Sequence, residues 1–166
     1  IDILSAKGTV FVAQGRYEQA ETIRISNAID VVGITGKTED VVLANTAAGQ
    51  KIFILDNSEA MVANLVAEGG SRTHALNSDF GGNIRIDAAG GVVSNCVIRN
   101  ASCISRYPRG IGIYLDSEAA LVTQCVITNN YTSGRYDNEL YGIGVHIKNG
   151  TIENSLVADN YSNNIT

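Results

Sequence analysis

Three aspartates stand at matching positions in successive copies of a short sequence pattern. Asp56, Asp87 and Asp116 lie 31 and 29 residues apart by subtraction. If the copies stack, neighbouring carboxylates come within roughly 4.8 Å, one strand spacing. Carboxylates this close repel unless a charge offsets them, so the set predicts either a bound Ca²⁺ or ion pairs with the nearby Arg85 and Lys148. Asp87 and Asp116, or Asp56 and Asp116, also suit the two-carboxyl geometry of glycoside hydrolysis, although any stacked Asp column would do so. The alternative is that each Asp ends a strand and caps a bend.

Basic and aromatic residues stand two positions before Asp87 and Asp116 and at the matching positions of two other copies, whereas Ile54 precedes Asp56. More basic and aromatic residues follow in the long connections. Arg106-Tyr107 and Arg135-Tyr136 recur 29 residues apart by subtraction. Tyrosine rings stack on apolar faces, and arginine donates hydrogen bonds to hydroxyl and carboxylate oxygens. The combination predicts a glycan-binding groove, with ordinary packing of solvated loops as the alternative. The predicted ligand-binding residues are Arg24, Arg85, Tyr114, His146, Arg106, Tyr107, Arg135 and Tyr136.

The elements that must position these side chains follow from a repeat of about thirty residues. Its clearest copies open at 52–56, 83–87, 112–116 and 144–148, and a fainter copy opens at 22–26. Within each copy apolar residues alternate with polar ones, which is the period of a strand and not of a helix. Strands that return to the same face every turn must pair in parallel with the next turn. The sequence therefore predicts an all-β, single-stranded, right-handed parallel β-helix of about five coils.

Long connections leave the predicted coils at equivalent points, over 68–82, 101–112 and 130–144. Stacking places all three on one side of the β-helix, where loops commonly carry function. Before them run two columns of turn residues that tolerate a left-handed backbone. The columns are Asn64, Asn95, Gln124 and Asn154, then Asn100, Asn129 and Asp159.

The three cysteines do not form a disulfide framework or a zinc site, because their number is odd and no short paired spacing occurs. Cys96 and Cys125 fall in one inward column and are expected to be buried neighbours. A bond between them is geometrically conceivable.

Composition places the chain among single globular domains. Its 166 residues are 45% hydrophobic and carry a formal net charge of −5. The acidic balance argues against nucleic acid and anionic membrane as partners, and no apolar run reaches the ~20 residues that a membrane span needs. We expect one β-helix domain over 1–166, with 1–20 as N-terminal cap and first strand and 21–166 as coils.

The two ends of the chain give a further expectation. The sequence opens without Met and stops just after a coil, so we expect a piece of a longer chain. A coil end without a cap exposes unpaired strand groups. It predicts end-to-end self-association or a missing C-terminal domain.

The opening Gly8-Thr9-Val10-Phe11-Val12-Ala13-Gln14-Gly15-Arg16-Tyr17 resembles the first coil of secreted bacterial members of the right-handed parallel β-helix, or pectin-lyase-like, superfamily. Gln14 stands where that pattern usually has Pro. The resemblance implies a secreted, periplasmic or cell-surface protein that acts on or binds polysaccharide. By resemblance to pectate lyases, Asp56, Asp87 and Asp116 would be Ca²⁺ ligands and Arg85 the base, although no lyase motif is present.

Two functions are therefore expected. The first is a secreted or cell-surface module that binds glycans along the first-strand face, as an adhesin or a carbohydrate-processing accessory, without a cofactor. The alternative is a polysaccharide lyase or glycoside hydrolase that acts on acidic polysaccharide through Asp87, Asp116 and Arg85, with calcium if it is a lyase.

Overall fold

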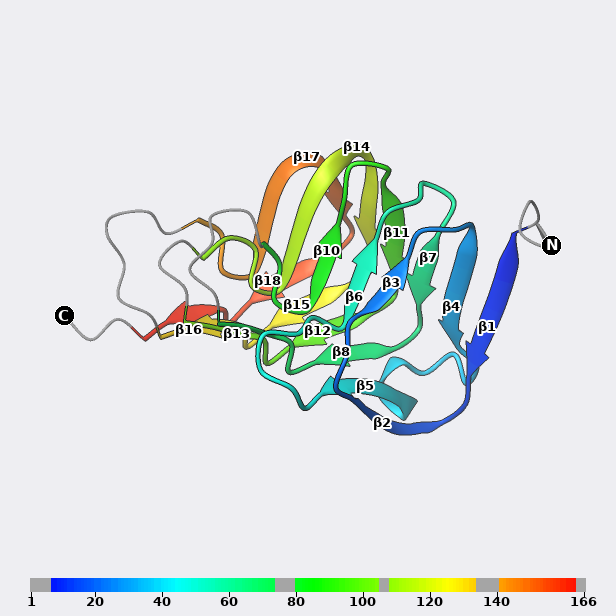
Figure 1. Cartoon of the computed structure of the whole chain (residues 1–166), viewed down its shortest axis with the longest axis horizontal. Coiled ribbons are helices and arrows are strands. Elements are labelled where there is room, and N and C mark those ends of the chain that lie inside the picture. The colour runs from blue at the N-terminus through cyan, green and yellow to red at the C-terminus, as the bar shows by residue number, and fades with distance from the viewer. Residues whose placement is uncertain (1–6, 74–79, 105–107, 134–140, 164–166) are drawn as a thin grey trace.

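The computed structural model describes residues 7–73, 80–104, 108–133 and 141–163. They form a parallel β-solenoid whose strands stack from one end of the molecule to the other (Figure 1). Apart from a single 3₁₀ turn, η1 (Thr38–Asp40), the regular structure of these residues is all strand. The predicted all-β parallel fold is confirmed.

Strands fall into four positions around each turn. The first position holds β3 (Ile23–Ile25), β6 (Phe53–Leu55), β10 (Ile84–Ile86) and the starts of β14 (Ile113–Thr123) and β17 (Val145–Glu153). The second holds β1 (Gly8–Val12), β4 (Ile29–Gly33), β7 (Met61–Ala63), β11 (Gly91–Ser94) and the ends of β14 and β17. Because β14 pairs with both β10 and β11, the first two positions form one hydrogen-bonded sheet.

The third and fourth positions form two further sheets. The third contains β2 (Gly15–Gln19), β5 (Val41–Asn45), β8 (Val66–Glu68), β12 (Val97–Arg99), β15 (Val126–Thr128) and β18 (Leu156–Ala158). The fourth contains the short strands β9 (Ser71–Arg72), β13 (Ser102–Cys103), β16 (Tyr131–Thr132) and β19 (Tyr161–Ser162).

Two details differ from the sequence prediction. Across the described ranges about four turns carry all four strand positions, against the expected five coils, because the turn that begins at β3 lacks the short fourth strand. The fourth sheet itself was not predicted: the long connections that open at 68, 101 and 130 begin with paired strands. Their first residues therefore belong to the solenoid wall.

The core follows the predicted alternation. Phe53, Ile84 and Ile113 stack in register and are fully buried, as are Leu55, Ile86 and Leu115 in the parallel column. Each such side chain contributes roughly 1.5–3 kcal/mol through burial. Packing of successive turns on one another thus supplies the stability that no single turn could have alone.

The bends are made by residues with a left-handed backbone, as the sequence predicts. Positive φ angles of 47° to 58° occur at Asn64, Asn95, Gln124, Asn154, Asn100, Asn129 and Asp159. Asn95 Nδ2 also donates a hydrogen bond to Asn64 Oδ1 at 2.8 Å, so the first amide column links successive turns.

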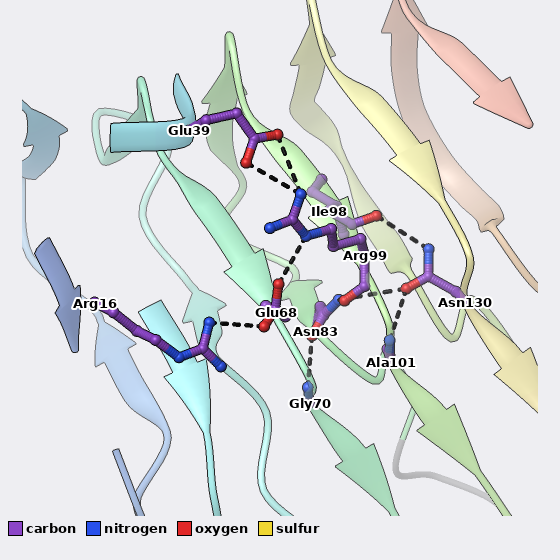
Figure 2. A network of polar contacts seen from close by, with 9 residues as sticks. All are labelled: Arg16, Glu39, Glu68, Gly70, Asn83, Ile98, Arg99, Ala101 and Asn130. Carbon is purple, nitrogen blue, oxygen red and sulfur yellow. Dashed lines mark hydrogen bonds and ion pairs between the residues drawn. The ribbon is translucent and has the colours of Figure 1, made fainter. Parts of the chain in front are cut away.

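A second amide ladder, which the sequence did not predict, lies inside the wall (Figure 2). Asn130 is fully buried; its Oδ1 accepts from the Ala101 N–H at 3.0 Å, and its Nδ2 donates to the Ile98 carbonyl at 3.1 Å. Asn83 Nδ2 donates to Asn130 Oδ1 at 3.3 Å, and Asn130 Nδ2 donates to Asn160 Oδ1 at 2.8 Å. The ladder satisfies backbone groups at the corner where the fourth sheet begins.

Charged side chains form a separate ladder on the outer face of the third sheet (Figure 2). Glu68 accepts from Arg16 Nη1 at 2.8 Å and from Arg99 Nε at 2.7 Å, and Arg99 Nη1 also pairs with Glu39 at 3.1 Å. Partial burial of Glu68 acts to raise the pKa of its carboxyl, but the hydrogen bonds from the two arginines outweigh it and lower the pKa. These ion pairs connect η1 and β2 to β8 and β12. Exposed pairs of this kind contribute little stability individually.

All three cysteines are buried thiols outside any disulfide bond. Cys96 and Cys125 are inward neighbours in successive turns, as expected, and no disulfide bond joins them. Burial raises the pKa of the Cys96 thiol well above its ordinary value, so this side chain behaves as a small apolar filler.

Candidate functional site

The outward row predicted for the first strand is present. Strand pairing places Arg24 beside Ile54, Ile54 beside Arg85, Arg85 beside Tyr114, and Tyr114 beside His146. Four of the predicted ligand-binding residues therefore lie on one face of the solenoid, in the order in which they occur in the chain. The other four, Arg106, Tyr107, Arg135 and Tyr136, lie outside the described residues.

A second column runs beside this row, outside the set named above as predicted ligand-binding residues. Its members are Phe80, Arg109 and Tyr141, and each stands immediately before a glycine with positive φ. Backbone bonds stack them: Gly81 N donates to the Arg109 carbonyl at 3.2 Å, and Arg109 and Tyr141 form a parallel bridge.

The glycines that follow this column are required by the backbone. Gly81, Gly110 and Gly142 have φ angles of 78°, 57° and 43°. A Cβ at Gly81 would also lie 2.7 Å from the Ile84 carbonyl oxygen. Only glycine tolerates both this positive φ and this close contact with a neighbouring backbone. The glycines therefore mark, in the sequence, the preceding residues that form the column, which are Phe80, Arg109 and Tyr141.

Rings and guanidinium groups from the two columns interleave in what we call the cation–aromatic cluster, defined by Phe80, Arg85, Arg109, Tyr114, Tyr141 and His146. The Tyr114 ring lies 4.8 Å from Phe80 and stacks on His146 at 5.3 Å between centroids. The Arg109 guanidinium lies 5.0 Å from the Phe80 ring centre and 4.5 Å from that of Tyr141.

Three further contacts complete the cluster. Tyr141 meets His146 edge to face at 6.0 Å. Arg85 lies 6.0 Å from the Tyr114 ring, and the buried Arg72 lies 5.5 Å from the Phe80 ring. Stacking between cations and aromatic faces of this kind stabilises a preformed arrangement.

The cluster has a buried floor and an exposed rim. Tyr114 points outward from its strand as predicted, yet only 2% of it is exposed, because Phe80 and His146 pack against its ring. Tyr141 is 40% exposed, and Arg85, Arg109 and His146 are half-buried. A ligand would therefore meet the Tyr141 ring and the edges of the Arg and His side chains, with Tyr114 supporting them from below.

Electrostatics in the cluster follow from burial and from Arg109. Burial raises the pKa of the Tyr114 hydroxyl, and the nearby Asp116 raises it further. Burial lowers the pKa of the His146 imidazole, and the charge of Arg109 lowers it further. At neutral pH the site thus presents a neutral imidazole and a neutral phenol beside fixed guanidinium charges.

We expect His146 to titrate below its ordinary pKa of 6.5 in the folded chain. In the unfolded chain the imidazole takes up a proton near pH 6.5. Just below that pH the unfolded state therefore binds more protons than the folded state, which favours unfolding. The stability contributed by the neutral ring is therefore complete above that pH and decreases below it. Proton NMR of the imidazole measures the midpoint. Arg109→Gln should move it upward, whereas a wild-type midpoint at or above 6.5 would contradict the packing described for the ring.

Two of the three aspartates in the column, Asp87 and Asp116, form ion pairs with basic side chains. Arg85 Nε pairs with Asp87 Oδ1, Arg24 Nη1 lies 3.6 Å from Asp87 Oδ2, and Lys148 Nζ lies 2.7 Å from Asp116 Oδ1. Lys148 makes this contact from a bulge, because β17 pairs Asn149, and not Lys148, with Asp116. Basic side chains therefore offset the repulsion between these carboxylates, which is one of the two outcomes that the sequence predicted.

The contacts of the aspartates also bear on whether this column could bind Ca²⁺. Asp56 Oδ1 accepts from the Ala89 N–H at 3.2 Å, which is the bend-capping role named above as the alternative. Within the described ranges no three Asp, Glu, His or Cys side chains converge in a way that could hold a metal ion. Asp56, Asp87 and Asp116 form no such group, and calcium binding at this column stays a prediction.

Comparison of the chain with protein-family models, with curated proteins and with solved structures finds no match in any of the three. No helix in the described part of the chain is long and apolar enough to span a membrane. The function proposed for the chain therefore rests on the geometry of the cation–aromatic cluster.

Proposed function

We propose that the chain is a secreted or cell-surface β-solenoid module of the pectin-lyase-like type that binds glycans on the outer face of its first strands. The observation that carries the proposal is the cation–aromatic cluster, in which an exposed Tyr141 ring lies between Arg109 and His146. The parallel solenoid and the Gly8–Tyr17 opening support the superfamily assignment.

The cluster suits carbohydrate for two reasons. A tyrosine ring offers an apolar face to the C–H groups of a pyranose ring, and its hydroxyl offers a hydrogen bond. Guanidinium groups have five N–H donors each, so Arg85 and Arg109 can contact an aromatic ring and still donate to sugar oxygens. Stacking by Phe80 and Tyr114 holds these side chains in place before a ligand arrives, which reduces the entropy lost on binding.

Retention on a panel of immobilised neutral and acidic polysaccharides tests the proposal. Tyr141→Ala is expected to weaken binding to the retained glycan roughly tenfold, equivalent to about 1.4 kcal/mol. Tyr161→Ala is the matched control, because Tyr161 is similarly exposed, at 45%, but stacks on Tyr131 in the fourth sheet. The proposal fails if no polysaccharide retains the wild-type chain, or if both variants bind as it does.

The lyase or hydrolase alternative remains a prediction without a specific observation in its favour. The same panel measures it: formation of unsaturated or reducing-end products from polyuronates, with and without Ca²⁺, would favour the alternative. Retention without product formation favours the binding module.

A further inference from the structure

The polar side chains on the outer face of the first strands are arranged as cations beside carboxylates. Asp87 pairs with two cations: Arg85 Nε contacts its Oδ1, and Arg24 Nη1 lies 3.6 Å from its Oδ2. Asp116, one turn further along, pairs with Lys148 at 2.7 Å. Both carboxylates still reach solvent, since 16% of the Asp87 side chain and 22% of the Asp116 side chain are exposed. A ligand on this face therefore meets hydrogen-bond donors and acceptors side by side.

The charges on this face nearly balance. The first-strand row and the aspartate column together contribute three basic and three acidic side chains, which are Arg24, Arg85, Lys148, Asp56, Asp87 and Asp116. Arg109 adds one positive charge from between two aromatic rings, and the whole chain has a formal net charge of −5. A polymer with a carboxylate on every sugar would therefore find no comparable excess of positive charge to attract it.

One of these carboxylates also acts on the cation–aromatic cluster. Burial raises the pKa of the Tyr114 hydroxyl, and the charge of Asp116 raises it further. Burial and Arg109 lower the pKa of the His146 imidazole, and the charge of Asp116 opposes them. An anionic group bound against the cluster would thus lie within the field of Asp116, and like charges in a partly buried place repel strongly.

Hydroxyl groups fit this arrangement better than sugar carboxylates do. A hydroxyl both donates and accepts hydrogen bonds, so it can bridge a carboxylate and the cation beside it. An ionised sugar carboxylate only accepts. To pair with Arg24 or Arg85 it would have to displace Asp87, and a partly buried carboxylate that loses its cations costs free energy.

We propose that the outer face selects neutral glycans and excludes polymers of uronic acids, with Asp87 and Asp116 as the excluding groups. This selectivity presupposes the glycan-binding function proposed above and adds the class of glycan to it. The two carboxylates that would form the catalytic pair of a hydrolase here act on specificity, by repelling an acidic chain and by accepting hydrogen bonds from a neutral one.

Matched polymers that differ only in charge test the selectivity. Soluble glucan, mannan and galactan are each compared with the same polymer after oxidation of primary hydroxyls to carboxylates. At about 0.01 M salt, where the Debye length is roughly 30 Å, an oxidised polymer should bind the wild-type chain about tenfold more weakly than its retained neutral parent. The difference should shrink at about 1 M salt, where a Debye length of roughly 3 Å screens the carboxylates.

Asp116→Asn tests whether this carboxylate produces the exclusion. The affinity for the oxidised polymer relative to its neutral parent should rise about tenfold, because one negative charge is removed and Lys148 loses its resident partner. Glu18→Gln is the matched control, since Glu18 pairs with Arg16 at 3.7 Å on the third sheet and its loss changes the net charge equally. Its ratio should equal that of the wild type. Thermal melting checks that both variants are folded.

The outcomes separate this selectivity from glycan binding itself. Oxidised polymers that bind as tightly as their neutral parents, or more tightly, would overturn the selectivity and leave glycan binding intact. Equal rises for Asp116→Asn and Glu18→Gln would also overturn it, because they would indicate an effect of net charge alone. A preference that does not change with salt would contradict electrostatic exclusion without any substitution. If no polymer retains the wild-type chain, the proposed function fails.

Discussion

Replacing Asn130 by alanine is expected to lower the free energy of unfolding by roughly 3–5 kcal/mol, since each buried polar group left without a partner costs about 1–3 kcal/mol. The substitution removes the acceptor of the Ala101 N–H and the donor to the Ile98 carbonyl. It also takes away one of two partners of Asn83 Nδ2 and of Asn160 Oδ1, which keep the Arg99 carbonyl and the backbone N–H of residue 130. Because Asn130 is fully buried, the groups that lose this side chain face the protein interior and not bulk solvent.

Equilibrium unfolding in urea measures the effect as a lower midpoint. Asn163→Ala is the control, since Asn163 is exposed near the end of the last described turn. Its midpoint should remain within experimental error of the wild type. If Asn130→Ala unfolds at the wild-type midpoint as well, the amide ladder does not bear on the stability of this corner.

The amide ladder also shows which contacts the sequence alone does not predict. Columns that recur at one repeat position, such as Asn64 and Asn95, could be predicted because a fixed period places them above one another. Asn83 and Asn130 occupy different positions in the repeat and are 47 residues apart. Asn83 precedes a first strand, whereas Asn130 follows a bend, so only the closed path of the chain brings them together.

The candidate site divides in the same way. The row through Arg85, Tyr114 and His146 follows from strand alternation and from the period, and the structure has it. Phe80, Arg109 and Tyr141 also keep one position in the repeat, four residues before Ile84, Ile113 and Val145, so their column could be predicted from the spacing, whereas its contact with the row could not. The burial of Tyr114 depends on contact between the two columns, which neither column reveals alone.

The aspartate column illustrates a choice that the sequence left open. Repulsion among stacked carboxylates required an offset, which a cation from solution or basic side chains could supply. Arg24 spans from β3 past β6 to reach Asp87 on the turn beyond. A long side chain can thus form an ion pair with a residue two turns away. A prediction that considers only neighbouring turns of the repeat does not find such a pair.

A glutamine at Leu55 is expected to cost roughly 3–5 kcal/mol of stability, whereas a glutamine at the neighbouring Ile54 should cost about 1 kcal/mol or less. Leu55 is fully buried and packs tightly, since a Cβ added at Gly91 would lie 2.8 Å from its side chain. A buried amide there would lose apolar contact and lack partners. Ile54 points outward between Arg24 and Arg85, where an amide can meet water or a guanidinium.

The pair of substitutions tests the assignment of faces on which every inference about the outer surface depends. Both place the same side chain on β6, one residue apart, so strand propensity and position in the solenoid are matched. Urea midpoints should fall steeply for Leu55→Gln and slightly for Ile54→Gln. Because a strand shifted by one residue would exchange the two faces, reversed effects would place Arg85, Tyr114 and His146 inside the solenoid and remove the cation–aromatic cluster from its surface. Equal effects would contradict the burial assigned to Leu55 and the outward position assigned to Ile54.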